Sequence, residues 1–241
     1  MKVLKNIRVK FTPLFLNGFL GRAGFISFVL PVVVLFSVSI LFSAAAPEKG
    51  LPYKLLVSTQ SRLWLEGDST FHRYESRASV ILLDTSGELA TNTKSLKEQE
   101  LLNNIVLVPG FSRFILNIPV EKLKSGIPGL AGKMHSALKY KKFSDIIFTL
   151  FDYKAERKAG KPNVFTVKAT GILNVAGQEK EISLEFEAET TDKFIKVTGE
   201  KDILMTGFGI KPPKVLLIKA ADKVDIKWEL YLEAYQPPEN K

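Results

Sequence analysis

The chain has 241 residues, of which 34 are basic and 25 are acidic, and it contains no cysteine. The lack of cysteine excludes a thiol nucleophile, a thiolate metal site, a disulfide framework and a lipid anchor on cysteine. Residues 1–46 hold five of the basic residues and no acidic one, so the remaining 29 basic and 25 acidic residues give a net charge of only +4. This balance gives little support to a nucleic-acid partner, and we expect none.

The first element in chain order is an uncharged apolar segment that follows a basic one. Residues 25–42 form the apolar segment, and Ser-Ala-Ala-Ala follows at 43–46. This order is typical of a secretory signal peptide. We expect cleavage near Ala45, which leaves residues 47–241 as one all-β domain in the periplasm. The alternative is an uncleaved anchor in the inner membrane, with the same domain on the periplasmic side.

Beyond residue 46 the sequence indicates about eight strands separated by turns. Apolar positions mark them at residues 63–65, 80–83, 114–118, 146–150, 164–175, 182–189, 193–205 and 224–234. The segments 182–189 and 224–234 alternate apolar and polar residues without a break, which is typical of strands with one dry and one wet face. Ala-Gly-Gln at 176–178 predicts a hairpin turn. The pattern favours an antiparallel sandwich or barrel.

One helix is expected between these strands. Over residues 131–141, Met134, Ala137 and Leu138 share one face at helical spacing. Lysines gather at the end of this segment, where cations suit the helix dipole. The segment 85–110 is polar and then mixed, and it favours no assignment.

Five segments, taken in order, resemble motifs of the YceI-like family of exported proteins. They are residues 61–72, 118–126, 143–148, 170–180 and 205–210. The first contains Gly-Asp-Ser-Thr-Phe-His at 67–72, similar to the family's Gly-x-Ser-Thr-x-His element. The fourth contains Gly171 and Gly177 of a Gly-x-Leu-x-x-x-Gly hairpin. Two positions depart from the family pattern: Ser144 stands where proline is usual, and Gly207 where aspartate is common.

The resemblance extends over residues 54–235 and implies both a fold and a ligand. The implied fold is a lipocalin-like, antiparallel, eight-stranded barrel with one short helix near its opening. The implied ligand is a long isoprenoid-type lipid held in the lumen. No established reaction is implied, so we expect a carrier or sequestering protein without catalysis or a cofactor.

An eight-stranded barrel is just wide enough to be filled by side chains or to hold one small ligand. The residues expected to face the lumen are Leu116, Phe148, Leu150, Leu184, Phe186, Trp228 and Leu230. On the strands 182–189 and 224–234 no charged residue is in phase with them, which suits a hydrocarbon chain. The alternative is that these side chains fill the core, which would make the chain a structural or interaction module of the envelope stress response.

The reactive side chains give weaker signals. His72 lies among Asp68, Ser69 and Thr70, but neighbours on a strand alternate faces and do not converge as a catalytic triad requires. We interpret His72 as a polar residue at the barrel rim, and a His72-dependent hydrolase is the weakest hypothesis. His135 is expected to be exposed, and no pair of histidines has metal-ligand spacing.

Basic residues around the expected helix suggest a second partner. Lys133, Lys139, Lys141 and Lys142 are positioned to contact anionic lipid head groups at a membrane surface. The alternative is a solvated helix face without a partner. The sequence does not indicate an oligomeric state.

Overall fold

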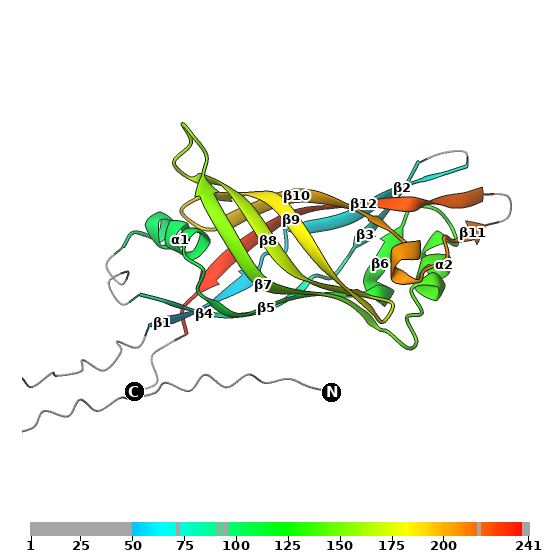
Figure 1. Ribbon diagram of the computed structural model, residues 1–241, viewed down its shortest axis with the longest axis horizontal. Helices are drawn as coiled ribbons and strands as arrows, with labels where there is room; N and C mark the ends of the chain where they lie inside the picture. The colour runs from blue at the N-terminus through cyan, green and yellow to red at the C-terminus, as the bar shows by residue number, and fades with distance from the viewer. Residues whose placement is uncertain (1–49, 71–72, 91–92, 94–95, 216–217, 238–241) are drawn as a thin grey trace, which may run out of the picture. The chain divides into compact units, whose positions relative to one another are not determined.

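Antiparallel β-strands dominate the fold (Figure 1). The computed structural model describes residues 50–70, 73–90, 93, 96–215 and 218–237. The strands are β1 (Leu51–Val57), β2 (Arg62–Ser69), β3 (Arg73–Ala78), β4 (Leu82–Leu89), β5 (Phe111–Pro119), β6 (Leu123–Ser125), β7 (Asp145–Arg157), β8 (Val164–Val175), β9 (Gln178–Thr190), β10 (Ile195–Leu204), β11 (Lys214–Val215) and β12 (Ile218–Tyr235). The described helices are α1 (Glu98–Leu107), α2 (Leu130–Ala137) and the short 3-10 turns η2 (Val120–Lys122) and η3 (Thr206–Phe208).

Three pairs of these strands run end to end and act as single long strands. β1 and β2 both pair with β12, where Val57 lies opposite Leu232 and Arg62 opposite Glu229. In the same way, β3 and β4 lie beside β2 and β1, and β5 and β6 lie beside β4 and β3. The order β1/β2, β3/β4, β5/β6, β7, β8, β9, β10, β12 then returns to β1/β2. The described strands thus form a closed antiparallel barrel of eight strands, as predicted.

The hairpin of β8 and β9 shows how local sequence builds this ring. The two strands pair over their whole lengths. Ala176 and Gly177 at the turn have φ angles of 52° and 79°, the left-handed pair that a type I′ hairpin turn requires. The predicted hairpin and its turn are therefore confirmed. A side chain at Gly177 would also collide with the Phe143 ring, because an added Cβ would lie 2.2 Å from Phe143 Cζ.

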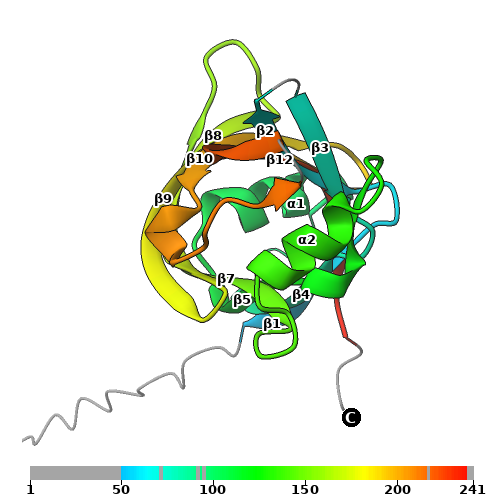
Figure 2. The ribbon, with the colours of Figure 1, turned by 90° about the vertical axis from the view of Figure 1, so that its right-hand side faces the viewer.

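The two helices lie at opposite ends of the barrel (Figure 1). Figure 2 looks along the barrel from one end, where α2 lies across the ring of strands. The buried side chains of α1 are Leu102, Ile105 and Val106, which point into the barrel. Their spacing of three and four residues is that of an amphipathic helix. In α2, Leu130 and Met134 are buried in the same way.

Each helix belongs to its own cluster of buried side chains. The α1-end cluster is built from α1 and the surrounding strand ends, with Tyr53, Leu55, Ile105 and Phe165 among its members. The α2-end cluster includes Val120, Leu123, Met134, Leu138 and Phe208. Tyr53, Phe165, Ile105, Leu123 and Val120 are among the largest fully buried side chains of the described residues. Both ends of the barrel are therefore packed.

The structure also differs from the sequence predictions in several elements. α2 ends at Ala137, earlier than the expected 141, and turns follow it. α1, β1 and β3 were not predicted, and α1 falls in the segment 85–110 that favoured no assignment. The expected signal peptide or anchor of residues 1–46 lies outside the described residues. Neither helix of the described part of the chain is long and apolar enough to cross a membrane.

Candidate ligand-binding site

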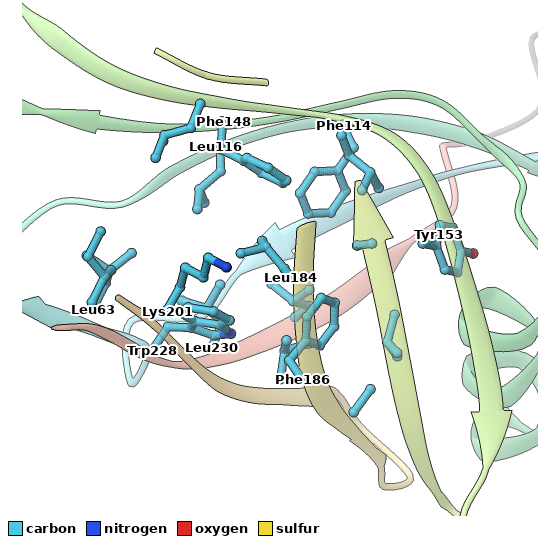
Figure 3. Close-up of a pocket in the computed structure, with 18 of the residues that line it drawn as sticks. Leu63, Phe114, Leu116, Phe148, Tyr153, Leu184, Phe186, Lys201, Trp228 and Leu230 are labelled. Carbon is cyan, nitrogen blue, oxygen red and sulfur yellow. The ribbon is translucent and has the colours of Figure 1, made fainter. Parts of the chain in front are cut away.

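A cavity of about 220 Å³ lies inside the barrel, between the two packed ends (Figure 3). Its wall takes residues from the barrel strands and from α1. Apart from Tyr153, Trp228 and Lys201, every described residue of the wall has a purely hydrocarbon side chain. The interior is thus both hollow and apolar. This geometry excludes a core that side chains fill along its whole length.

The structure places every residue predicted to face the lumen on the wall of this cavity. They are Leu116, Phe148, Leu150, Leu184, Phe186, Trp228 and Leu230. Strand periodicity explains the placement, because side chains two residues apart on one strand point to the same face. Leu184 and Phe186 come from β9, and Trp228 and Leu230 from β12. That these residues contact a ligand stays a prediction.

A β-bulge in β7 changes which residues face inward. Leu150 pairs with Gly171 and Asp152 with Thr170, so Phe151 has no partner on β8 and points outward, with 60% of its surface exposed. The extra residue shifts the alternation by one position. Tyr153 consequently faces the cavity, although strict alternation from Leu150 would have turned it outward.

Tyr153 holds α1 across one end of the cavity. Its hydroxyl lies 2.9 Å from the carbonyl oxygen of Ile105 and 3.0 Å from that of Val108, and its one hydrogen is shared between these two acceptors at the end of α1. Burial, with a smaller contribution from the charge of Asp152, raises the pKa of the Tyr153 hydroxyl above its ordinary value. The tyrosine therefore presents its ring to the cavity and its polar atom to the helix.

Aromatic packing continues from Tyr153 around the same end. The ring of Phe111 lies 5.9 Å from that of Tyr153, 5.5 Å from that of Tyr53 and 5.4 Å from that of Phe114, centroid to centroid. The contacts with Tyr53 and Phe114 are edge-on and that with Tyr153 is tilted, and aromatic pairs prefer such arrangements to face-to-face stacking. Phe111, Phe114 and Tyr153 thus form an aromatic wall of the cavity beneath α1.

Gly199 on β10 makes room for the indole that lines the middle of the cavity. A Cβ at this position would lie 2.5 Å from Trp228 Cζ2 and 2.7 Å from Phe186 Cβ. The rings of Trp228 and Phe186 meet edge to face, with centroids 6.3 Å apart. The space left by glycine on β10 is therefore filled by the large side chains of Trp228 on β12 and Phe186 on β9.

The sequence analysis missed one charged residue in the wall. Lys201 lies on β10 in phase with Ile195, Val197 and Ile203, all of which line the cavity. Strands 182–189 and 224–234 carry no such charge, and the expectation of a wholly apolar lumen was drawn from them alone. That expectation was wrong for β10. Its signal was present in the sequence, since Lys201 is two residues from both Gly199 and Ile203.

Of the two histidines, only His135 lies within the described residues. His72, the predicted rim residue, lies outside them. His135 is half-buried instead of exposed, because its Nε2 atom lies 2.8 Å from the carbonyl oxygen of Leu123. No group of three or more metal-ligating side chains occurs among the residues that the structure describes.

The lysines near α2 lie on the surface as predicted. Lys133, Lys139, Lys141 and Lys142 are all exposed. The Nζ atom of Lys142 lies 5.2 Å from the centroid of the Phe143 ring. Contact with a membrane stays a prediction for these residues.

The closed ring of eight strands and its apolar cavity define a lipocalin-like barrel. Residues 68–232 match the model of the YceI-like domain, which is most of the chain, so the protein belongs to the YceI-like family. The sequence matches no protein with a curated description.

The solved structures that share the fold include two with a TM-score above 0.5. The chain is similar to Burkholderia cenocepacia BcnA, with 14% identity and a TM-score of 0.53 over 75% of this chain and 100% of the other. It is also similar to a polyisoprenoid-binding domain from Saccharophagus degradans implicated in plant cell wall breakdown. That match has 16% identity and a TM-score of 0.52 over 77% of this chain and 99% of the other.

Proposed function

We propose that this protein binds one long apolar lipid of the isoprenoid type inside its barrel and carries or sequesters it without catalysis. The observation that carries the proposal is the apolar cavity of about 220 Å³ between two packed ends. The residues that line this cavity come from both ends of the barrel, so its volume is spread over a long path and the space is narrow. A narrow space suits a slender chain better than a compact ligand. A relative of the same fold, the domain from Saccharophagus degradans, is named for polyisoprenoid binding.

Burial of the chain supplies the affinity. About ten chain carbons, each contributing about 0.8 kcal/mol, give roughly 8 kcal/mol before the costs of association. Loss of translational freedom and ordering of the chain reduce this sum, which leaves affinity on the order of micromolar. Wall residues such as Leu184, Phe186 and Trp228 are only half-buried, so part of their apolar surface is free to contact such a ligand.

Extraction of the purified protein tests this function directly. The full chain is produced in a bacterial host that makes isoprenoid lipids and is exported there, and the purified protein is extracted with organic solvent. Mass spectrometry of the extract is expected to show a co-purified long-chain lipid in an amount comparable with the protein. An extract without lipid would favour an interaction module of the envelope whose interior holds no ligand.

We also propose that the protein works in the periplasm, because residues 1–46 contain a basic segment followed by an apolar one, as a secretory signal does. Cell fractionation together with the mass of the exported protein tests the location and the processing of the leader. A mature N-terminus near residue 46 supports cleavage, and an intact N-terminus in the inner-membrane fraction supports the anchored form. Recovery of the folded domain in the cytoplasm would refute both.

We propose that the protein also contacts a membrane surface, because a lipid carrier must collect or deliver its lipid there. The four exposed lysines at 133, 139, 141 and 142 lie on or just after α2, the helix across one end of the barrel. Vesicles that contain anionic lipids are expected to bind the protein at low salt and release it as salt is raised. Binding that does not depend on anionic lipid content would remove this part of the proposal.

A further inference from the structure

Lys201 is the one charged side chain in the described wall of the cavity, and its surroundings are hydrocarbon. Figure 3 shows its amine extending into the space that Leu116, Leu184 and Trp228 also face. Its strand neighbours Glu200 and Asp202 occupy exposed positions, since alternate residues of a strand point to opposite faces. They are therefore turned away from the cavity that Lys201 enters.

No ion pair joins Lys201 to any carboxylate of the described residues, whereas other lysines of this sheet have such partners. Lys196 on the same strand lies 3.2 Å from Glu229, and Lys227 lies 2.9 Å from Glu66, both on the outer face. An ammonium in apolar surroundings without a partner is unfavourable. A ligand that brings an oxyanion to this position would remove that cost and gain a charge-assisted hydrogen bond.

We propose that Lys201 selects a lipid whose apolar chain ends in a carboxylate, with the carboxylate bound inside the barrel beside Trp228. The inference rests on the proposed lipid-binding function and adds the chemistry of the head group to it. The chain would occupy the cavity between Lys201 and the aromatic wall beneath α1. Uncharged lipids with the same chain would bind more weakly, because they leave the ammonium without a counter-charge.

The single charge of the site and its few hydrogen-bond donors favour a carboxylate over a phosphate. One lysine balances one negative charge, and a phosphate monoester carries about −1.5 to −2 at neutral pH. A phosphate also needs several hydrogen-bond donors, whereas Trp228 supplies the only other side-chain N–H in the described wall. A phosphate would therefore leave charge and acceptor atoms unsatisfied in a hydrocarbon environment.

Trp228 provides a direct reporter for the test. The chain has two tryptophans, and Trp64 lies outside the cavity, where its Nε1 donates to Glu66 at 2.9 Å. A Trp64→Phe background leaves Trp228 as the sole tryptophan, next to Lys201. Fluorescence titrations of the delipidated protein then compare farnesoic acid with farnesol, which carry the same isoprenoid chain with and without a carboxylate.

We expect the protein to bind farnesoate about tenfold more tightly than farnesol, as a hydrogen bond to a charged group allows. Lys201→Met is expected to abolish this preference by weakening the acid while leaving the alcohol nearly unchanged. Lys201→Arg, which keeps the charge, retains the preference. Lys168→Met is the matched control, because it removes an equally charged residue from an exposed position on β8.

The outcomes separate this inference from the proposed function. Equal binding of acid and alcohol, or a preference that survives Lys201→Met, overturns the role of Lys201 and leaves lipid binding intact. A preference lost equally in Lys168→Met would show that overall charge is responsible, and it overturns the inference as well. Failure of both probes to bind, together with an extract without lipid, would overturn the proposed function itself.

Discussion

The ends of the barrel and its middle are both lined by inward-facing apolar side chains, yet the ends are packed and the middle is hollow. At the ends, Phe165 and Leu123 are only 0% and 2% exposed. In the middle, Leu184, Phe186 and Trp228 face inward but stay half-buried, because their surface borders the cavity. The difference comes from α1 and α2, which insert apolar side chains only at the ends. Strand alternation therefore determines which face of each strand is apolar, and the helices determine where along the barrel the interior is filled.

Truncation of a packed side chain gives the largest expected difference between the two regions. Phe165→Ala in the α1-end cluster should lower the free energy of unfolding by about 3–5 kcal/mol, the usual cost of a new cavity. Leu184→Ala in the middle should cost about half as much, because its side chain already borders empty space. Urea unfolding of both variants measures the two costs. Equal costs would contradict the contrast between packed ends and a hollow middle.

Filling the cavity should strongly weaken ligand binding. Ala169 lines the cavity on β8, and Ala169→Trp would place an indole in the space that the lipid needs. We expect lipid affinity to fall by about 100-fold, which corresponds to about 2.7 kcal/mol. The control is Thr170→Trp, which adds the same bulk one position along, on the outer face. Unchanged binding by Ala169→Trp would show that the ligand lies elsewhere.

A smaller effect is expected where β10 yields space to Trp228. Gly199→Ala should cost about 1–3 kcal/mol of stability, because its Cβ would lie 2.5 Å from the indole. It should also shift the Trp228 emission. The matched control is Gly132→Ala in α2, where an added Cβ meets nothing within 4 Å and should stabilise by up to about 1 kcal/mol. A neutral Gly199→Ala would mean that Trp228 is not held against β10.

Alkaline pH should weaken the α1 end gradually. Burial raises the pKa of both Tyr53 and Tyr153 above the ordinary value of 10.0. The folded protein therefore keeps these protons while the unfolded chain loses them, so stability is fully present below pH 10 and falls as pH rises further. Each tyrosine contributes a slope of up to about 1.4 kcal/mol per pH unit. Tyr153→Phe should reduce the slope measured by thermal unfolding between pH 9 and 11, and an unchanged slope would refute the assignment.

The sequence predicted the elements that depend on local pattern. The β8–β9 hairpin follows from alternation and from Ala176 and Gly177 in its turn, and the cavity-facing positions of β9 and β12 follow from period two. α1 was missed although Leu102, Ile105 and Val106 have helical spacing, because the polar residues before them obscure its start. β3 was missed because Ser76, one of its buried positions, is polar and interrupts the apolar alternation that Tyr74 begins.

The cavity itself could not be derived from the sequence. Whether the inward side chains meet across the barrel depends on the ring of eight strands and on where α1 and α2 insert, and neither is a local property. The inward position of Tyr153 depends on the bulge at Phe151, which alternation alone does not indicate. Lys201 was overlooked because Gly199 interrupts the apolar pattern of β10.

Native mass spectrometry of the exported protein and its Ala169→Trp variant, prepared side by side, tests the hollow middle as a lipid site most directly. The account predicts that the unaltered protein carries one bound lipid per chain and that the filled variant carries none, with both folded. A lipid adduct of equal occupancy on both proteins, or only the bare mass for the unaltered one, would contradict it.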